Sequence, residues 1–261
     1  MRPFHRIMIR RDCGFFSDFL TSLAGIKYCY DNNIDFHVDW KNRLYPTLND
    51  TNLFDEFFFQ EKIEREPDVT HSNITPYGYQ FTDVANEDSE EKLYEFYKPF
   101  ADLLTNLNLL NSPFINSIPK NIFEGIRVLG FHKRGTDHVG HGLILSDELV
   151  LQKIKKELDA NPYDKILMIT DDLNSLNFFQ KQFGNVLITT DCMKCADHTG
   201  VHLLQENPNR HLLAAQVVAD AMLLSFTDKK LITKSNVSTF SALCNLKPDN
   251  FIYIDKGVTY A

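Results

Sequence analysis

A short loop of mixed charge is the segment of this sequence best equipped for chemistry. Arg134, Gly135, Thr136, Asp137 and His138 stand together directly after a predicted strand. An arginine side chain presents a planar fork of donors that matches phosphate. Glycine allows backbone N–H groups to approach an anion, and threonine adds a hydroxyl group. The loop therefore predicts an anion site, although a surface turn held by an Arg–Asp pair fits the same spacing.

Two further segments carry polar groups at positions that suit a ligand. Residues 233–242 pass from a predicted strand end into a helix start rich in hydroxyl and amide side chains. The first N–H groups of a helix are unpaired and attract phosphate oxygens, whereas an ordinary cap by Ser235 or Asn236 is the alternative. Asp220 lies in an otherwise apolar helical segment, so its carboxylate needs a partner. That partner is either a base or ribose, or an N–H group of a neighbouring loop.

A cluster of sulfur and imidazole side chains follows another predicted strand. Cys192, Cys195, His198 and His202 offer four potential ligands at short spacing, and structural zinc sites use two cysteines and two histidines. The usual zinc finger has a much longer spacer between its two pairs. We therefore interpret the segment as a polar loop, with zinc as the minor alternative, and expect no metal at the anion site.

Alternating strands and helices must position these groups. The first unit has a strand at 6–11, a turn at 12–18, a helix at 19–33 and a strand at 34–40. In the second half, the predicted strands are 127–134, 165–170, 185–190, 229–235 and 251–255, and the predicted helices are 146–161, 171–184, 210–228 and 236–246. This alternation predicts an α/β fold with a doubly wound parallel sheet, in which ligands bind beyond the carboxyl ends of strands.

The middle of the chain is less regular. Residues 52–60 include three consecutive phenylalanines, which favour core packing over an exposed platform. A helix is expected within 86–110, kinked or split at Pro99. The proline-containing stretch 111–125 is a connector, and we expect an N-terminal domain over 1–120 and a C-terminal domain over 121–261.

Composition limits the classes of function. The chain has 261 residues, a formal net charge of −8 and 43% hydrophobic residues. Such a chain builds a full core, which excludes disorder as its main state, and its acidity does not suit a general nucleic-acid binder. We find no apolar run near the ~18 residues that cross a bilayer and no signal peptide. With an odd count of 5 cysteines, we expect reduced thiols and a cytoplasmic protein without a transmembrane segment.

The motifs together resemble the fucosyltransferase superfamily, which includes α1,6-fucosyltransferases, nodulation fucosyltransferases and protein O-fucosyltransferases. The first family motif is close to His-x-Arg-(Arg/Gly)-Thr-Asp-Lys, and this chain has His-Lys-Arg-Gly-Thr-Asp-His at 132–138. The later pattern matches Asp220, the Leu-Ser pair at 224–225 and the Ser-Asn-Val-Ser turn at 235–238. The segment 13–17 resembles the first glycine-bearing loop of the family more loosely. The resemblance covers about 130 residues well and the first 40 weakly.

This resemblance implies two facing Rossmann-like domains of the GT-B type with a cleft between them, a GDP-fucose donor, inversion at the anomeric centre and no metal or other cofactor. Arg134 would bind the diphosphate and Asp220 the guanine. The other implied donor-binding residues are His132, Gly135, Thr136, Asp137, His138, Asp171, Ser235, Asn236 and Ser238. Gly14, Phe15 and Phe16 would belong to a loop on the acceptor side.

Three residues are candidates for the base that removes the proton of the acceptor hydroxyl group. The chain has His138 where the family has a lysine, and the acidic residue found a few positions later is missing. His141 is the available base in that loop, because its ordinary pKa of about 6.5 suits proton transfer. Asp12 and Asp18 in the opposing loop are the alternatives.

The expected partners are a nucleotide sugar and a glycan or lipid-linked sugar acceptor, with the oligomeric state open. Another GDP-sugar or a UDP-sugar would serve the same site. A non-catalytic module that binds nucleotide or glycan, and a zinc-stabilised interaction protein, are the alternatives from other classes.

Overall fold

The computed structural model describes residues 2–47, 49–72, 89–135, 145–196, 200–203, 209–233 and 235–254, and it leaves the side chain of His202 undescribed. Within these residues, two parallel sheets form the framework. The smaller sheet has the order β2-β1-β3, from strands β1 (Phe4–Ile9), β2 (Asp35–Trp40) and β3 (Val69–Ser72). The larger sheet has the order β6-β5-β4-β7-β8, from strands β4 (Val128–Lys133), β5 (Lys165–Thr170), β6 (Leu187–Thr189), β7 (Lys229–Ile232) and β8 (Phe251–Tyr253).

The larger sheet reverses its strand order at β4. The chain builds β5 and β6 on one side of β4, and then β7 and β8 on the other side. All six residues of β4 are buried, as expected for a central strand of a parallel sheet. A crevice forms beyond the carboxyl ends of strands where such a sheet reverses, and here that point lies between β4 and β7. This topology confirms the predicted α/β class with parallel strands.

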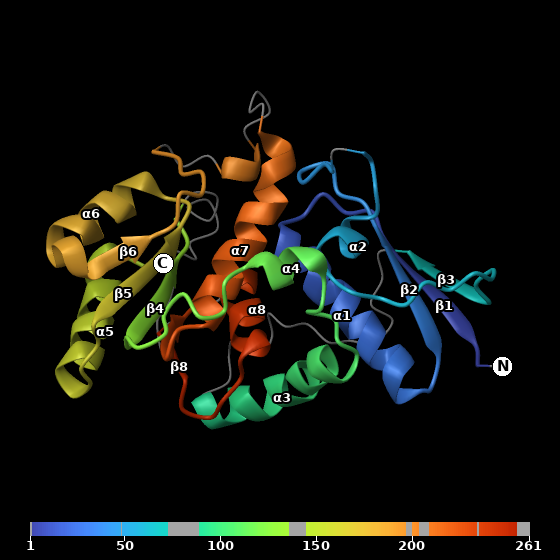
Figure 1. Cartoon of the computed structure of the whole chain (residues 1–261), viewed down its shortest axis with the longest axis horizontal. Coiled ribbons are helices and arrows are strands. Elements are labelled where there is room, and N and C mark those ends of the chain that lie inside the picture. The colour runs from blue at the N-terminus through green and yellow to red at the C-terminus, as the bar shows by residue number, and fades with distance from the viewer. Residues whose placement is uncertain are drawn as a thin grey trace.

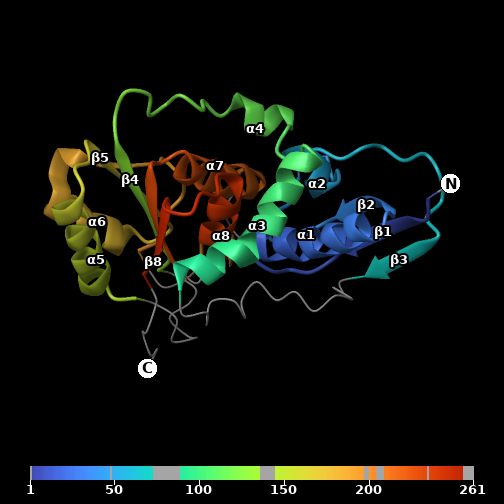
Figure 2. The same ribbon diagram turned by 90° about the horizontal axis from the view of Figure 1, so that it is seen from below.

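Eight α-helices pack around these sheets in the described residues. They are α1 (Phe15–Asp31), α2 (Leu53–Phe57), α3 (Glu90–Asn106), α4 (Pro113–Ser117), α5 (Asp147–Ala160), α6 (Leu173–Phe183), α7 (Leu213–Ser225) and α8 (Asn236–Cys244). Short 3-10 turns lie at Gly184–Val186, Val201–Leu203 and Arg210–Leu212. Both views place α7 and α8 between the two sheets, with α5 and α6 on the outside of the larger one (Figure 1, Figure 2). No helix among the described residues is long and apolar enough to span a membrane.

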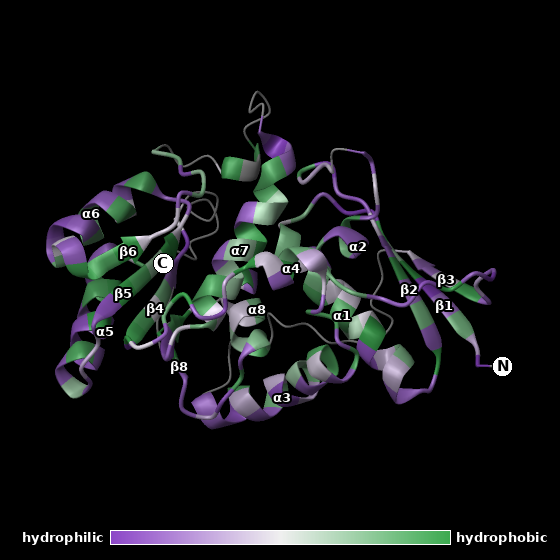
Figure 3. Ribbon diagram, in the orientation of Figure 1, coloured by the Kyte–Doolittle hydropathy of each residue, from purple (hydrophilic) through white to green (hydrophobic). Residues whose placement is uncertain are grey.

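A continuous hydrophobic cluster joins the smaller sheet and its helices to α7 and α8. At its centre, the rings of Phe16 in α1 and Phe240 in α8 stack with centroids 4.2 Å apart. The hydroxyl groups of Tyr97 in α3 and Thr239 in α8 lie 3.4 Å apart. A second cluster lies between the larger sheet and the helices α5 and α6. The hydropathy colouring of Figure 3 agrees with this packing: α7, between the sheets, is mostly apolar, whereas α3, α5 and α6 each carry a hydrophilic face.

The sequence-based prediction of the elements is confirmed in the second half of the chain, where helix caps mark the boundaries. Ser146 caps α5 by accepting a hydrogen bond from the backbone N–H of Leu149, and Asp172 caps α6 in the same way. The predicted domain division at 120 stays a prediction. The connector at its boundary contains α4, whose N-cap Ser112 also donates a hydrogen bond to the carbonyl of Phe57.

In the first half, the structure differs from the expectation at the start of α1 and at strand β3. Helix α1 begins at Phe15 rather than at 19, because Phe15 and Phe16 are buried and extend its apolar face. The strand β3 was not expected, since three of its four residues are exposed and its sequence lacks an alternating pattern. For helix α3, expected to be kinked or split at Pro99, the helix continues through the proline without a split, and the kink stays a prediction. In the three-phenylalanine patch, core packing holds for Phe57 and Phe58, which are buried.

One buried charge makes the stability of the fold depend on pH. The side chain of Lys230 in β7 is fully buried, and its Nζ has no hydrogen-bond partner among the described residues. Burial lowers the pKa of this amine from 10.5 to about 8. The unfolded chain therefore binds the proton more tightly than the folded chain between pH 8 and 10.5. Below pH 8 both states carry the charge, and the folded state bears the full cost of burying it.

We therefore expect Lys230→Met to raise the free energy of unfolding at pH 7 by about 3 kcal/mol. The gain should shrink as the pH rises from 8 towards 10.5, because the wild-type amine then loses its charge in the folded state. Denaturant unfolding at pH 7 and at pH 9.5 measures both effects. Lys229→Met, at the half-buried neighbouring position, is the matched control. An equal gain at both pH values would contradict the expectation.

Candidate functional site

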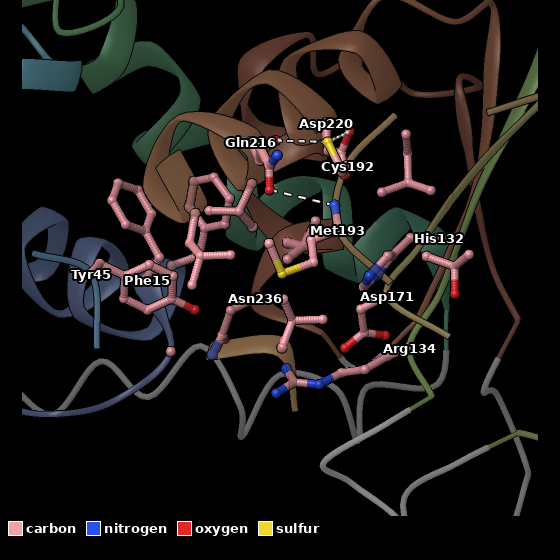
Figure 4. A pocket seen from close by; sticks show the side chains of 18 of the residues that line it. Phe15, Tyr45, His132, Arg134, Asp171, Cys192, Met193, Gln216, Asp220 and Asn236 are labelled. Carbon is pink, nitrogen blue, oxygen red and sulfur yellow. Dashed lines mark hydrogen bonds between the residues drawn. The ribbon is translucent and has the colours of Figure 1, made fainter. Parts of the chain in front are cut away.

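A pocket opens beyond the carboxyl ends of β4 and β5, and both halves of the chain line it (Figure 4). It includes the start of α1, the segment after β6, one face of α7 and the first turn of α8. The lining residues are Gly14, Phe15, Phe16, Ser17, Tyr45, His132, Arg134, Ile169, Thr170, Asp171, Cys192, Met193, Val201, Leu213, Gln216, Val217, Asp220, Asn236 and Val237. The structure thus brings together most of the predicted site residues that it describes.

The loop after β4 is locked onto the turn that follows β5. The backbone N–H of Gly135 donates a hydrogen bond to Asp171 Oδ1 over 3.3 Å. A side chain at Gly135 would collide with the Cβ atom and carboxylate of Asp172, so only glycine fits this approach. The predicted strand-end turn at 171–172 is confirmed, because Asp172 is the N-cap of α6. The guanidinium of Arg134 lies beside Asp171 at the edge of the pocket (Figure 4).

A buried lysine, Lys133, contacts the backbone at the start of the same loop. The side chain of Lys133 is almost fully buried, and its Nζ donates a hydrogen bond to the carbonyl oxygen of Arg134 over 3.3 Å. The same amine lies 3.5 Å from Asp147 Oδ1 at the start of α5. The buried amine of Lys133 therefore holds the carbonyl of Arg134 directly after the end of β4.

Helix α8 begins with two polar residues, Ser235 and Asn236, at or beside the pocket. Ser235 occupies the N-cap position, but its side chain makes no capping hydrogen bond. The hydroxyl of Ser235 is buried without a partner among the described residues, which is costly unless a ligand supplies one. Asn236 lines the pocket directly. His132 Nδ1 lies 3.1 Å from Ser238 Oγ, which ties the end of β4 to this turn.

The opposite side of the pocket carries a buried carboxylate. Asp220 in α7 is 7% exposed, and burial raises the pKa of its carboxyl group. Its Oδ1 accepts a hydrogen bond from the thiol of Cys192 over 3.0 Å. Gln216, one turn earlier in α7, accepts the backbone N–H of Met193 through Oε1 over 3.4 Å. The partner that the sequence demanded for Asp220 is therefore the thiol of a neighbouring segment.

Sequence reasoning missed Tyr45, Cys192, Met193 and Gln216 as lining residues. The sequence contains a signal for Gln216 and for Cys192. Gln216 lies one helical turn before Asp220, on the same face of the helix. Cys192 also follows the end of a strand of the larger sheet. Its spacing from Cys195, His198 and His202 favours a polar loop or a zinc set and does not by itself predict a place in the pocket.

The two N-terminal candidates for the base are not among the described residues that line this pocket. Asp12 forms an ion pair with Arg43, whose hydrogen bond lowers the pKa of the aspartate. Asp18 is fully buried, and its Oδ2 accepts a hydrogen bond from Asn42 over 2.8 Å. Burial raises the pKa of Asp18 to about 6. A catalytic role for either carboxylate stays a prediction, and their contacts show that both hold the loop at 41–47.

Several predicted residues lie outside the described residues. They are Thr136, Asp137, His138, His141 and His198, together with the side chain of His202. For the possible zinc set, Cys192 bonds to Asp220, and Cys195 pairs through its backbone with Asp171. Within the described part of the chain, no group of three or more His, Cys, Asp or Glu side chains is placed to hold a metal ion.

The structure defines a doubly wound α/β protein with a pocket beyond the carboxyl ends of its strands. Comparison with known proteins shows which solved structures share this fold. No protein-family model and no curated protein matches the chain. The chain is similar to the fucosyltransferase NodZ from Bradyrhizobium, with 14% identity and a TM-score of 0.56, over 94% of this chain and 92% of that chain.

Two further structures of NodZ α-1,6-fucosyltransferase are similar to the chain. One was co-crystallised with GDP, with a TM-score of 0.55, 14% identity and coverage of 94% of this chain and 93% of that chain. The other was soaked with GDP-fucose, with a TM-score of 0.54, 16% identity and the same coverage. The likeness agrees with the fold that the resemblance to fucosyltransferases implies, and at these identities what the chain shares with NodZ is the fold.

The position of Arg134 leads to a prediction about anion binding. Arg134→Ala should weaken binding of a nucleoside diphosphate by about 2 kcal/mol or more, as expected for a lost charge-assisted hydrogen bond. Arg134→Lys should also fail, because a point charge does not reproduce the fork. Calorimetry with GDP measures the loss. Arg127→Ala, before the opposite end of β4, is the control, and normal binding by both Arg134 variants would refute the prediction.

Proposed function

We propose that this protein is an inverting glycosyltransferase that moves L-fucose from GDP-fucose to a hydroxyl group of a glycan or lipid-linked sugar. One observation carries the proposal: the pocket gathers Arg134, the start of α8 and Asp220 at the point where the larger sheet reverses. NodZ, whose fold the chain shares, was solved with GDP and after soaking with GDP-fucose. Another GDP-sugar or a UDP-sugar would occupy the same groups.

The geometry supports a division of labour along the pocket. Arg134 and the N–H groups at the start of α8 would hold the diphosphate and stabilise the charge that develops on it as the sugar leaves. The hydroxyl of Ser235 would bind a phosphate oxygen, and Asp220 would accept hydrogen bonds from the guanine. Asp171, which accepts a hydrogen bond from the backbone N–H of Gly135, would contact the nucleobase.

The acceptor would approach from the N-terminal side. Gly14, Phe15 and Phe16 line the pocket on its N-terminal side, where they would form the acceptor-side loop. In the GT-B arrangement, residues 1–120 would form the acceptor domain and residues 121–261 the donor domain, with the reaction in the cleft between them. Fixing both substrates in this geometry supplies much of the rate enhancement.

Calorimetry with GDP and UDP, followed by a turnover assay with a panel of nucleotide sugars, tests the proposal. We expect tighter binding of GDP than of UDP and transfer from GDP-fucose. Binding of neither nucleotide would overturn the proposed function. Binding without turnover of any donor in the presence of glycan acceptors would assign the chain to the class of non-catalytic nucleotide-binding modules.

Transfer should not require a metal ion. In the proposed site, the cationic charge opposite the diphosphate comes from Arg134 and from helix N–H groups, so a divalent ion has no assigned task. We expect the full rate in EDTA and no increase on addition of Mn²⁺ or Mg²⁺. A strict requirement for either ion would refute the assignment of Arg134 as the counter-charge.

We propose His141 as the general base. The variant His141→Ala should therefore have a kcat about 10²–10⁴-fold lower than that of the wild type. Donor binding should stay near normal, because the change removes a proton acceptor and no phosphate contact. The acidic limb of the pH–rate profile should disappear with the imidazole. The measurement is kcat over pH 5–9 with saturating donor.

Asp12→Asn and Asp18→Asn provide the comparison for His141→Ala. A small effect in His141→Ala, together with a lost acidic limb in one aspartate variant, would move the base to the N-terminal side. If all three variants keep the limb, the base is none of these side chains, and a phosphate oxygen of the donor becomes the candidate.

A further inference from the structure

The contact between Cys192 and Asp220 joins two segments that meet only in the folded chain. The thiol lies after β6, the carboxylate lies in the middle of α7, and both line the pocket (Figure 4). The Sγ–Oδ1 distance of 3.0 Å is short for a sulfur donor. A buried carboxyl group without a partner would carry a large desolvation cost, and this contact fixes the Asp220 side chain in one orientation.

The thiol acts as a donor throughout the neutral range. Burial, followed by the negative charge of Asp220, raises the pKa of Cys192 to about 12. The S–H group therefore keeps its proton at pH 7, and a carboxylate only accepts. The direction of the hydrogen bond is thus from Cys192 to Asp220 and does not reverse.

The backbone around Cys192 is itself anchored. Lys194 Nζ donates to the carbonyl oxygens of Thr190 and Cys192 over 2.6 and 2.9 Å. On the helix side, Gln216 Oε1 accepts the N–H of Met193. The thiol is consequently held at a fixed distance from α7, and it can determine where the Asp220 carboxylate lies.

We infer that Cys192 is a positioning residue for nucleobase selection, since its thiol holds the Asp220 carboxylate to accept the adjacent N1–H and 2-amino donors of guanine. This inference rests on the proposed function, in which Asp220 faces the base. A carboxylate has no donor of its own, so it pairs with two neighbouring donors and rejects a base edge that presents an acceptor. Hypoxanthine keeps N1–H but lacks the amino group, which makes inosine diphosphate the informative competitor.

Binding of GDP and IDP to the full chain tests the inference. We expect wild type to prefer GDP, and Cys192→Ala to reduce the GDP-to-IDP affinity ratio by about tenfold, because a misplaced carboxylate no longer reaches both donors. Cys192→Ser should restore most of the ratio, since a hydroxyl also donates. Met193→Leu alters the same wall without removing the donor, so both affinities should move together. Thermal unfolding of each variant verifies that it is folded.

The possible results distinguish failure of the proposed function from failure of the positioning role of Cys192. If wild type binds neither nucleotide, the proposed function fails together with this inference. If wild type binds GDP but shows no preference over IDP, or if Cys192→Ala keeps the ratio, only the positioning role is overturned. A serine variant as unselective as the alanine variant also overturns it. Should the alanine variant not fold, Cys192→Ser and Cys192→Val, compared for the same ratio, decide the question.

Discussion

The packing of α8 against α1 is the contact on which the pocket depends. The two helices meet through the stacked rings of Phe16 and Phe240, deep in the shared hydrophobic cluster. Each helix begins at the pocket, α1 directly after Gly14 and α8 directly after Ser235. Joining the bodies of the helices therefore fixes the distance between their N-terminal ends. An aromatic pair contributes only about 0.5–1.5 kcal/mol beyond its buried area, but here its geometry sets the width of a site.

The resulting pocket combines apolar walls with a few fixed charges. Phe15, Val217 and Val237 exclude water, whereas Arg134, Asp171 and Asp220 provide charges at its edges. A low dielectric strengthens every interaction between these charges and a ligand. It also makes an unpaired group expensive, which explains why Asp171 accepts from Gly135 and Asp220 accepts from Cys192. Next to the lining residue Asn236, the buried hydroxyl of Ser235 has no partner among the described residues.

The sequence predicted the larger sheet well because its strands are continuous apolar runs with clear helix caps between them. It also placed Arg134 and Ser235 at strand ends, where topology alone brings them to one edge. It could not reveal the pair of Cys192 and Asp220, since a contact between a loop and a distant helix leaves no local pattern. The edge strand β3 was missed for a similar reason, because pairing with β1 and not its own composition makes it a strand.

The two acidic residues before and within α1 show how a supporting role resembles a catalytic one. Asp18 holds Asn42, which also donates to the carbonyl of Cys13, and Asp12 holds Arg43. The carbonyl of Arg43 in turn accepts a hydrogen bond from Arg210 before α7.

These contacts fix the loop that places Tyr45 against Phe15 in the pocket, with ring centroids 5.6 Å apart. Removing either carboxylate would move Tyr45 and slow transfer even if neither carboxylate touches a substrate. A reduced rate alone therefore does not distinguish a base from a support. The acidic limb of the pH–rate profile does, because only loss of the titrating group abolishes it.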